Sequence, residues 1–588
     1  MGRYDSRVIN KNRYSIDKFY GYNHGLKIGA GEFYDMKNLT SSYYPVLSSR
    51  HKRAEFNVSG DVHALFSKEK ILYVKNGSLY YGGEAVTGFP YLYPMYDSVR
   101  KMVSMGAYVV IFPDKVYLNT NDLTDFGSIE ASFATEEGTN TSYTLCALDG
   151  EKYENYVKGN TAPENPENGA MWLDTSSKPH TLNQYDEATS MWVGISTTYV
   201  KISTPNIGKF FKEYDCVKIS GSVIEDFNTD MIIWSCGDDY IIVAGIIDEE
   251  KTQNTVFEVN RKCPDMDFVC EGSNRIWGCN SELNEIYCCK LGDFKNWRCY
   301  MGIASDSYAV TVGSDGNFTG AIRYGSYTLF FKENCIHKVY DNVNPPFQVS
   351  TSYTRGVQKG SESSLCVVNE TLFYKSPTGV CAYEGGMPIT ISGDFGTLYY
   401  SDAVGGAFRD KYYISMKNKG NRSLFVYDLN TNLWHKEDDI NITEFATNNS
   451  NLYFIANDGT ENNIGMIDSE QPYGVFSGEL SGWSEESDFE WCAETGLIGL
   501  DIPEYKYVSR IILRLDLSDG ASMNVYIEYD SSGEWEKLHS ITSNELHAID
   551  LPLMRNRRCD HFRIKLAGTG EVKLYSITFN IEEGGELN

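Results

Sequence analysis

The chain has 588 residues, of which 41% are hydrophobic and 22% charged, a composition typical of globular domains with apolar cores and not of a disordered chain. Its formal net charge is −28, from 80 acidic and 52 basic residues. Such a surface repels phosphate, which disfavours sequence-specific nucleic-acid binding but leaves open a channel in which DNA slides without adhering. The longest apolar run, at 240–247, is far shorter than the roughly 18–20 residues of a membrane-spanning helix, so we expect no membrane partner.

The amino-terminal segment contains no apolar signal-peptide core, and the 14 cysteines form no C-x-x-C pair. We therefore expect synthesis in a reducing cytoplasm, with most cysteines present as free thiols in apolar cores.

Short alternating runs broken by Gly, Asn, Asp and Ser dominate the sequence, and helical periodicity is nearly absent. The segments 71–83, 107–119, 328–340 and 371–383 each predict two strands joined by a tight turn. Asn76-Gly77 is typical of a type I′ turn, whose two central residues both need a positive φ.

These hairpins recur along the chain. Strands are predicted to start near Leu72, Tyr108, Ile276, Leu329, Leu372, Tyr412 and Leu452. The last four positions are 43, 40 and 40 residues apart, and a period of roughly 40–50 residues is typical of four-stranded propeller blades. The sequence therefore predicts an all-β fold with a β-propeller of about six or seven blades, which an insertion interrupts after Tyr108.

A second recurrence is the pattern Y-D-x-x-T-x-x-W at 185–192 and 427–434, with a shorter version at 529–535. An Asp in this position can accept hydrogen bonds from turn N–H groups, while Tyr and Trp pack across paired strands. We interpret each occurrence as a β-hairpin.

The composition changes along the chain indicate five regions, and the last is expected to be an antiparallel β-sandwich because its strands alternate regularly. The expected regions are an extended amino-terminal arm at 1–56, first blades at 57–133, an inserted β module at 134–258, remaining blades at 259–478 and the sandwich at 487–588.

Four segments resemble structural proteins of tailed bacteriophages and their prophages. FYGYNHGLKIGAGEFYDMKNLTSSYYPVLSSRHKR (19–53) resembles their amino-terminal signature, and MDFVCEGSNRIWGCNSELNEIYCCKLGDFKNW (266–297) looks like one of their blades. GVCAYEGGMPITIS (379–392) is similar to one of their hairpins, and 159–195 is similar to small modules of phage tail and fibre proteins.

The resemblance extends to propeller-bearing tail or packaged-DNA stabilisation proteins of the head-to-tail neck. It implies a virion protein without catalytic activity or cofactor, which forms a closed ring with copies of itself, contacts other neck or tail proteins and stabilises head–tail assembly and retained DNA. The alternative that it leaves open is a tail-tip, baseplate or fibre protein that binds host cell-surface glycans.

Two basic clusters stand out against the acidic background. Arg50, Lys52 and Arg53 lie in one, and Arg557 and Arg558 lie in the other. In a chain of this charge such clusters complement acidic surfaces, so we treat these five residues as candidate subunit-interface residues.

Exposed Trp and Tyr rings can stack on sugar faces, which makes Trp172 and Trp192 candidate glycan-stacking residues. The alternative interpretation is that these residues and Trp535 fill hairpins and cores.

No catalytic or metal-binding motif is evident. Asp428-x-Asn430-x-Asn432 resembles the start of a calcium loop, but Leu433 occupies the position that needs Gly, so a hairpin turn is expected. Cys335 and His337 lack a second ligand pair, and we expect a buried Cys and an exposed His. A propeller hydrolase would need two convergent carboxylates, which cannot be selected among 80 acidic residues.

Overall fold

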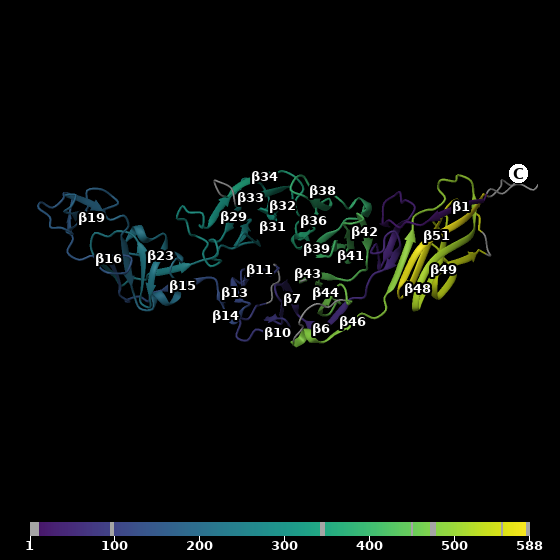
Figure 1. Ribbon diagram of the computed structural model, residues 1–588, viewed down its shortest axis with the longest axis horizontal. Coiled ribbons are helices and arrows are strands. Elements are labelled where there is room, and N and C mark those ends of the chain that lie inside the picture. Colours follow the sequence, from purple (N-terminus) through teal and green to yellow (C-terminus); the bar gives the residue numbers. More distant parts are fainter. Residues whose placement is uncertain are drawn as a thin grey trace, which may run out of the picture. The chain divides into compact units, whose positions relative to one another are not determined.

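The computed structural model describes residues 11–93, 99–341, 347–448, 451–470, 478–553 and 557–583, and these form strands and turns without an α-helix (Figure 1). The prediction of an all-β fold is therefore confirmed. The described part holds five single-turn 3-10 helices, at Ile207–Phe210, Glu225–Phe227, Glu362–Ser364, Gly393–Phe395 and Gly478–Ser481. None of the described helices has the length and apolar character needed to cross a bilayer.

Within the described ranges and outside the inserted segment, seven small sheets contain four or five strands each, and in six of them the strands pair in chain order. Six of them are β7 (Val62–Ser67), β8 (Ile71–Lys75), β9 (Ser78–Tyr81) and β10 (Glu84–Ala85); β11 (Lys101–Met105), β12 (Tyr108–Phe112), β13 (Val116–Asn119) and β14 (Asp122–Ser128); β27 (Phe268–Gly272), β28 (Arg275–Asn280), β29 (Glu285–Cys288) and β30 (Tyr308–Thr311); β31 (Phe318–Tyr324), β32 (Tyr327–Lys332), β33 (Cys335–Tyr340) and β34 (Gln348–Ser352); β35 (Cys366–Val368), β36 (Thr371–Ser376), β37 (Gly379–Tyr383) and β38 (Ile389–Thr390); β39 (Ser401–Phe408), β40 (Lys411–Asn418), β41 (Asn421–Asp428) and β42 (Leu433–Lys436).

The seventh sheet combines distant parts of the chain. In this sheet three strands that are consecutive in the chain pair side by side. A strand from the amino-terminal segment pairs with the third of them, and a strand from later in the chain pairs with the other edge of that amino-terminal strand. Its order is β43 (Ile442–Asn448), β44 (Asn451–Asn457), β45 (Asn462–Met466), β6 (Ala54–Gly60) and β46 (Trp483–Glu485).

The predicted hairpins lie where the alternation placed them. Each of the seven predicted strand starts lies in the second strand of a different sheet, namely β8, β12, β28, β32, β36, β40 and β44. Asn76 and Gly77 have φ values of 50° and 77°, which confirms the turn between β8 and β9.

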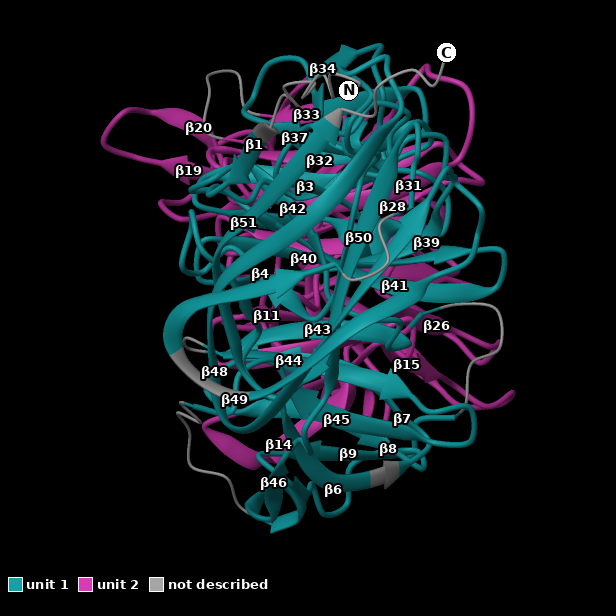
Figure 2. Cartoon of the chain, turned by 90° about the vertical axis from the view of Figure 1, so that its right-hand side faces the viewer, with its two compact units in different colours: residues 1–99, 329–337, 350–588 teal, residues 100–328, 338–349 magenta. Residues whose placement is uncertain are grey.

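By contact the chain divides into two compact units, which Figure 2 colours separately. Unit 1 comprises residues 1–99, 329–337 and 350–588, and unit 2 comprises residues 100–328 and 338–349. The five expected regions rest on changes in composition, whereas this division rests on contacts, so the boundaries of the five regions stay a prediction.

In unit 2, the inserted segment forms an eight-stranded sheet with its own apolar core. The order is β15 (Ala131–Ala134), β26 (Glu258–Arg261), β22 (Cys216–Ser220), β23 (Asp230–Gly237), β24 (Tyr240–Ala244), β21 (Tyr199–Ser203), β16 (Thr141–Cys146) and β25 (Lys251–Gln253). A further small sheet follows β16 in the chain, with the order β17 (Val157–Gly159), β18 (Met171–Asp174), β19 (Thr181–Asp186) and β20 (Met191–Gly194).

In unit 1, the carboxy-terminal segment forms a ten-stranded sheet together with the amino-terminal segment. The main path is β2 (Gly21–Tyr22), β3 (Glu32–Lys37), β47 (Glu490–Thr495), β50 (Phe562–Thr569), β48 (Lys506–Tyr529), β51 (Val572–Glu583), β5 (Leu47–Ser49) and β4 (Leu39–Thr40), while β1 (Lys11–Ile16) pairs with β51 and β49 (Glu536–Pro552) with β48. The segment expected to be an extended arm thus supplies five strands to this sheet.

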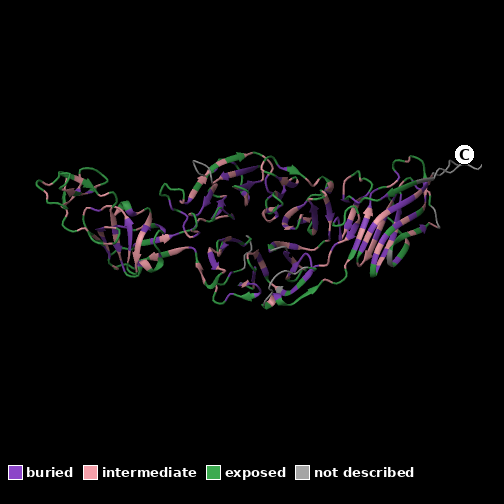
Figure 3. Ribbon diagram, in the orientation of Figure 1, coloured by how far each residue is buried: buried purple, intermediate pink, exposed green. Residues whose placement is uncertain are grey.

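Burial alternates along most of the long strand β48 of this sheet, which lies among the striped strands of Figure 3. Val508, Leu513, Val525 and Ile527 are among the buried members of β48. This period of two places one face of the sheet on an apolar core. All 14 cysteines are free thiols, and 11 of them are buried.

Candidate functional site

The sheet β17–β20 in unit 2 presents aromatic side chains on one face. Trp172 pairs with Asn183 across strands, Asn183 pairs with Gly194, and Tyr185 pairs with Trp192. Because directly paired residues and residues two apart project to the same face, these five positions share it. We name Trp172, Tyr185 and Trp192 the aromatic face.

The opposite face of the same sheet packs on a core, which explains why the aromatic face is turned away from it. Leu173 and Leu182 pair with each other and are buried in the apolar core of the inserted segment. Burial of these two side chains fixes which face is turned outward, because a one-residue slip would reverse both faces.

The Trp192 ring contacts each of the other two rings, and all three are half-buried. The Trp172 and Trp192 ring centroids are 5.6 Å apart at 68°, and those of Tyr185 and Trp192 are 5.4 Å apart at 60°. Trp172 Nε1 donates to the Gly159 carbonyl at 3.0 Å, which fixes that ring. Gly194, beside Asn183, adds no side chain to the face. The arrangement offers rigid apolar ring surface next to an amide, which suits the C–H face and the hydroxyls of a sugar.

The turn between β19 and β20 is held by its aspartate, as the sequence pattern predicts. Asp186 accepts hydrogen bonds from the Ala188 N–H at 3.1 Å and from the Thr189 hydroxyl at 2.8 Å. The hairpin interpretation of 185–192 is therefore confirmed.

The same pattern in unit 1 has a different environment. Trp434 is 1% exposed and Tyr427 is 8% exposed, with ring centroids 5.0 Å apart. Trp434 Nε1 donates to the Ile391 carbonyl at 2.7 Å. In this hairpin the two rings belong to the core and present no binding surface.

The first basic cluster binds acidic groups of its own unit. Arg53 donates to Glu437 and Asp438, each at 2.7 Å, and Arg50 donates to both carboxylate oxygens of Glu486 at 2.8 and 2.9 Å. Arg50 and Arg53 are 6% and 3% exposed. An intersubunit role for these arginines stays a prediction, but within one chain carboxylates already match their charge.

Lys52 points to a more open part of the same cluster. Its Nζ lies 2.8 Å from Asp488 and 3.7 Å from Glu485, and both acids are largely exposed. Of the three residues of this cluster, Lys52 is therefore the one that solvent and a partner can reach.

The second basic cluster lies beside aromatic rings of unit 1. The Arg557 guanidinium is 5.6 Å from the Tyr529 ring centroid and 3.6 Å from a Glu536 oxygen, and that of Arg558 is 5.0 Å from the Tyr505 ring centroid. The side chain of Arg557 is 53% exposed, which suits the predicted interface role without testing it.

Trp535 lies in the same region, half-buried. The Arg563 guanidinium and the Lys565 ammonium are 5.3 and 5.7 Å from its ring centroid. These cation–π contacts give Trp535 a structural role within the carboxy-terminal segment.

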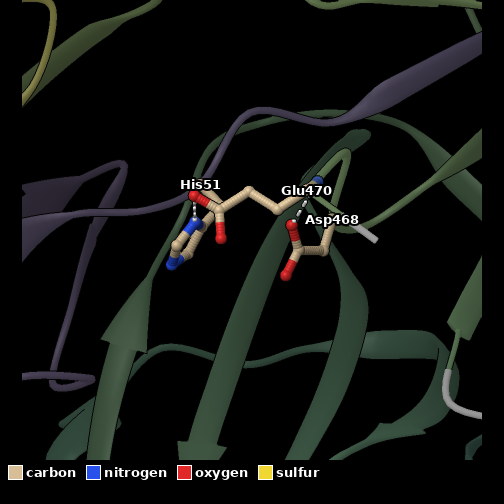
Figure 4. Close-up of side chains that lie close together, drawn as sticks. All are labelled: His51, Asp468 and Glu470. Atoms are coloured by element: carbon tan, nitrogen blue, oxygen red, sulfur yellow. Dashed lines mark hydrogen bonds and ion pairs between the residues drawn. The ribbon is translucent and has the colours of Figure 1, made fainter. Parts of the chain in front are cut away.

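One group of potential metal ligands occurs among the described residues (Figure 4). Ligand atoms of His51, Asp468 and Glu470 lie within 4.8 Å of one another. His51 Nδ1 is 3.0 Å from Glu470, Asp468 accepts from the Glu470 N–H at 2.9 Å, and Arg409 donates to Asp468 at 3.2 Å. Because these oxygens and this nitrogen already have protein partners, the geometry is that of an ion-pair network.

The expected hairpin turn at 428–432 is confirmed. Asp428 accepts from the Asn430 N–H at 2.9 Å and from the Ser41 hydroxyl at 2.7 Å, and Asn432 accepts from the Tyr427 hydroxyl at 3.0 Å. These oxygens hold the turn and the amino-terminal segment.

The expectation for His337 is wrong, because its side chain is buried and not exposed. Cys335, which is buried as expected, lies on the same strand, and His337 Nδ1 is 2.8 Å from the Thr351 hydroxyl. Burial lowers the pKa of His337 to about 4, so the ring is neutral near pH 7.

Sequence reasoning missed Tyr185 as a member of the aromatic face and Asn183 at its centre. The alternation of 181–186 could have placed both residues on the side of Trp192, because positions two apart share a face. It also missed the acidic partners of the arginines, since Glu437, Asp438 and Glu486 are about 400 residues away in the chain and no local pattern connects them.

No protein-family profile and no curated protein matches the sequence. Solved structures similar to this chain include an exo-β-1,3-galactanase from Phanerochaete chrysosporium, at 10% identity and a TM-score of 0.18, covering 52% of this chain and 92% of that one. A glycoside hydrolase family 43 arabinoxylan arabinofuranohydrolase from Bacillus subtilis has 7% identity and a TM-score of 0.15, covering 68% and 93%. The endosialidase of phage phi92 has 9% identity and a TM-score of 0.18, covering 80% and 71%.

These matches correct the expectation that the chain has no catalytic activity, because the similar structures include those of glycan-cleaving enzymes. At TM-scores this low they assign no activity or substrate to this chain.

Proposed function

We propose that this chain is a virion protein of a tailed phage that binds host cell-surface glycans through the aromatic face of β17–β20. The observation that carries this proposal is that Trp172, Tyr185 and Trp192 lie half-buried on one face of β17–β20, whereas the rings of the matching hairpin in unit 1 are buried. Aromatic rings held by a rigid sheet cost little conformational entropy on binding, so they suit a low-affinity, repeated contact such as a sugar.

The remaining sheets supply a scaffold for this face. We infer that the seven small sheets are the blades of one propeller and that β6 completes the seventh blade. Successive first strands contact one another within each unit, as β35, β39, β43 and β7 do in unit 1 and β11, β27 and β31 do in unit 2. Contact between successive innermost strands is what radial packing of blades requires.

The ten-stranded sheet is proposed to fold as a sandwich. The strand β48 pairs with β51 along its first half and with β50 along its second half. Gly520, with a φ of 81°, lies between the two halves, where a change of sheet needs a bend.

The second candidate function is assembly as a closed ring at the neck or tail, stabilising the head–tail junction and retained DNA. The resemblance of 19–53 and 266–297 to phage structural proteins favours it, and a net charge of −28 suits a surface near a DNA path because it repels the duplex. Both functions place the chain in the virion, where an arrayed glycan site gains avidity.

The glycan proposal is tested on the full chain with an array of bacterial surface glycans. The unchanged chain is expected to bind a subset of them, and the double variant W172A/W192A is expected to bind that subset at least about tenfold more weakly. The control is W483A, which removes a Trp that is 37% exposed in β46. Equal binding by all three proteins would contradict the proposal.

A further inference from the structure

A second aromatic surface lies in unit 2, on the eight-stranded sheet and apart from β17–β20. In β23 the pairing with β24 shifts between Ile233 and Ser235, which leaves Trp234 as the extra residue of a β-bulge. Ile233 is buried in the core, whereas Trp234 is half-buried on the other side of the strand. Bulges of this kind re-aim one side chain and are frequent beside binding sites.

Two tyrosines flank this tryptophan. The rings of Tyr199 and Tyr214 meet Trp234 edge to face, with centroids 6.0 and 6.2 Å away. Tyr214 has a φ of 68°, a conformation that is strained for a residue with a large side chain. Its N–H donates to the Ile233 carbonyl at 2.6 Å, which holds the strained residue beside Trp234 with its side chain 51% exposed.

A groove of about 410 Å³ opens beside Trp234, which is the member of this aromatic group that lines it. Asp230 and Trp234 line one side, and Arg298, Tyr300 and Met301 line the other. Tyr300 is 56% exposed. The volume lies within the roughly 300–1,000 Å³ of small-molecule sites, and the lining combines apolar rings with a few polar groups, as such sites do.

The charged groups of the groove are incompletely paired with each other. Arg298 and Asp230 approach to 3.9 Å, beyond hydrogen-bond distance, and their side chains are 47% and 35% exposed. A guanidinium that donates and a carboxylate that accepts, set this far apart, can bind two neighbouring hydroxyls of one sugar ring.

We propose that this groove is a second saccharide-binding site, which takes a neutral oligosaccharide. One sugar stacks its C–H face on Trp234, and its vicinal hydroxyls bind Asp230 and Arg298. An acidic sugar is disfavoured because Asp230 would face its carboxylate. The site uses none of the residues of the aromatic face, so it goes beyond the function proposed above.

The test starts from the full chain carrying W172A/W192A, which removes the aromatic face. The probes are neutral hexose and N-acetylhexosamine tetrasaccharides and, separately, oligosaccharides that contain sialic or uronic acid. Binding is followed by calorimetry and by saturation-transfer NMR. The neutral probes are expected to bind, with affinity reduced about tenfold or more by adding W234A and about fivefold or more by adding R298A.

R510A is the matched control, since Arg510 is also 47% exposed and ion-paired, to Asp550. Its affinity should equal that of the parent. Because R298A removes an exposed side chain, it remains informative if W234A fails to fold. Binding of acidic probes alone, binding that neither W234A nor R298A changes, or no binding by the W172A/W192A parent would overturn the second site. If the unchanged chain still binds and W172A/W192A abolishes that binding, the aromatic face stands without the groove.

Discussion

The hairpins β19–β20 and β41–β42 share one sequence pattern but differ in what covers them. Both use the aspartate to hold the turn, and both pack Tyr against Trp across the strands. In β41–β42 the Trp is 1% exposed, whereas Trp192 in β19–β20 is half-buried. The local pattern therefore determines that a hairpin forms. The segments that pack on the hairpin determine whether its rings are buried in a core or lie at a surface.

The cover over β41–β42 is the amino-terminal segment, which contacts β42 through β2, β3 and β4. Gly21, with a φ of 78°, passes so close that a Cβ there would lie 2.3 Å from the Trp434 carbonyl oxygen. Ser41 donates to Asp428, and Arg53 binds the two acids that follow β42. The amino-terminal segment is thus a structural clasp on this hairpin.

The largest expected difference between the two hairpins is in stability. W434A should cost about 3–5 kcal/mol, because it empties a packed core site, whereas W192A should cost about 1 kcal/mol or less. Chemical denaturation of the full chain, followed by near-ultraviolet circular dichroism, measures both. Similar costs would show that the rings of β19–β20 are also core.

The clasp is tested by R53M, with K52M as its matched control. R53M leaves Glu437 and Asp438 buried without their closest cation and should cost about 3–5 kcal/mol. K52M removes a charge whose partners are exposed and should cost about 1 kcal/mol or less. Equal shifts in the denaturation midpoint would argue against the clasp.

Acid should weaken unit 1 in two ranges of pH. Burial lowers the pKa of His337 from 6.5 to about 4, so its folded form resists protonation and stability falls as the pH drops from 6.5 towards 4. Burial opposes ionisation of the Asp438 and Glu486 carboxyls, but the neighbouring arginines outweigh burial and lower the pKa values of both carboxyls. The two carboxylates therefore stabilise the fold fully above the ordinary pKa values of Asp and Glu, and this stabilisation is lost as the pH falls below those values.

The two ranges are separated by H337Q and R53M, measured as thermal midpoints from pH 7 to pH 3. H337Q should flatten the upper range, and R53M should flatten the lower one. An unchanged profile in either variant would remove that group from the explanation.

The smallest expected effect concerns the turns. D186A should cost about 0.5–1.5 kcal/mol locally and speed hydrogen exchange at the Ala188 N–H, which Asp186 binds. D428A should cost more, because Asp428 is buried and also accepts from Ser41. A reversed order would mean that burial does not distinguish the two hairpins.

Much of the fold could be predicted because short-range alternation of apolar and polar residues determines it. The seven predicted strand starts and the Asn76-Gly77 turn follow from period-two burial and from turn chemistry. The pairing of β6 with β45 and the insertion of residues 11–49 into the carboxy-terminal sheet could not be predicted, because both join segments hundreds of residues apart. For the same reason, Trp192 and Trp434 could not be told apart from their shared pattern.

The measurement that tests the account most directly is glycan binding by the full chain and by W172A/W192A, with W483A as control. The unchanged chain and the control should bind equally, and the double variant should bind at least about tenfold more weakly, because stacked rings carry the binding. Binding that survives in W172A/W192A unchanged would contradict the claim that the aromatic face is a glycan site.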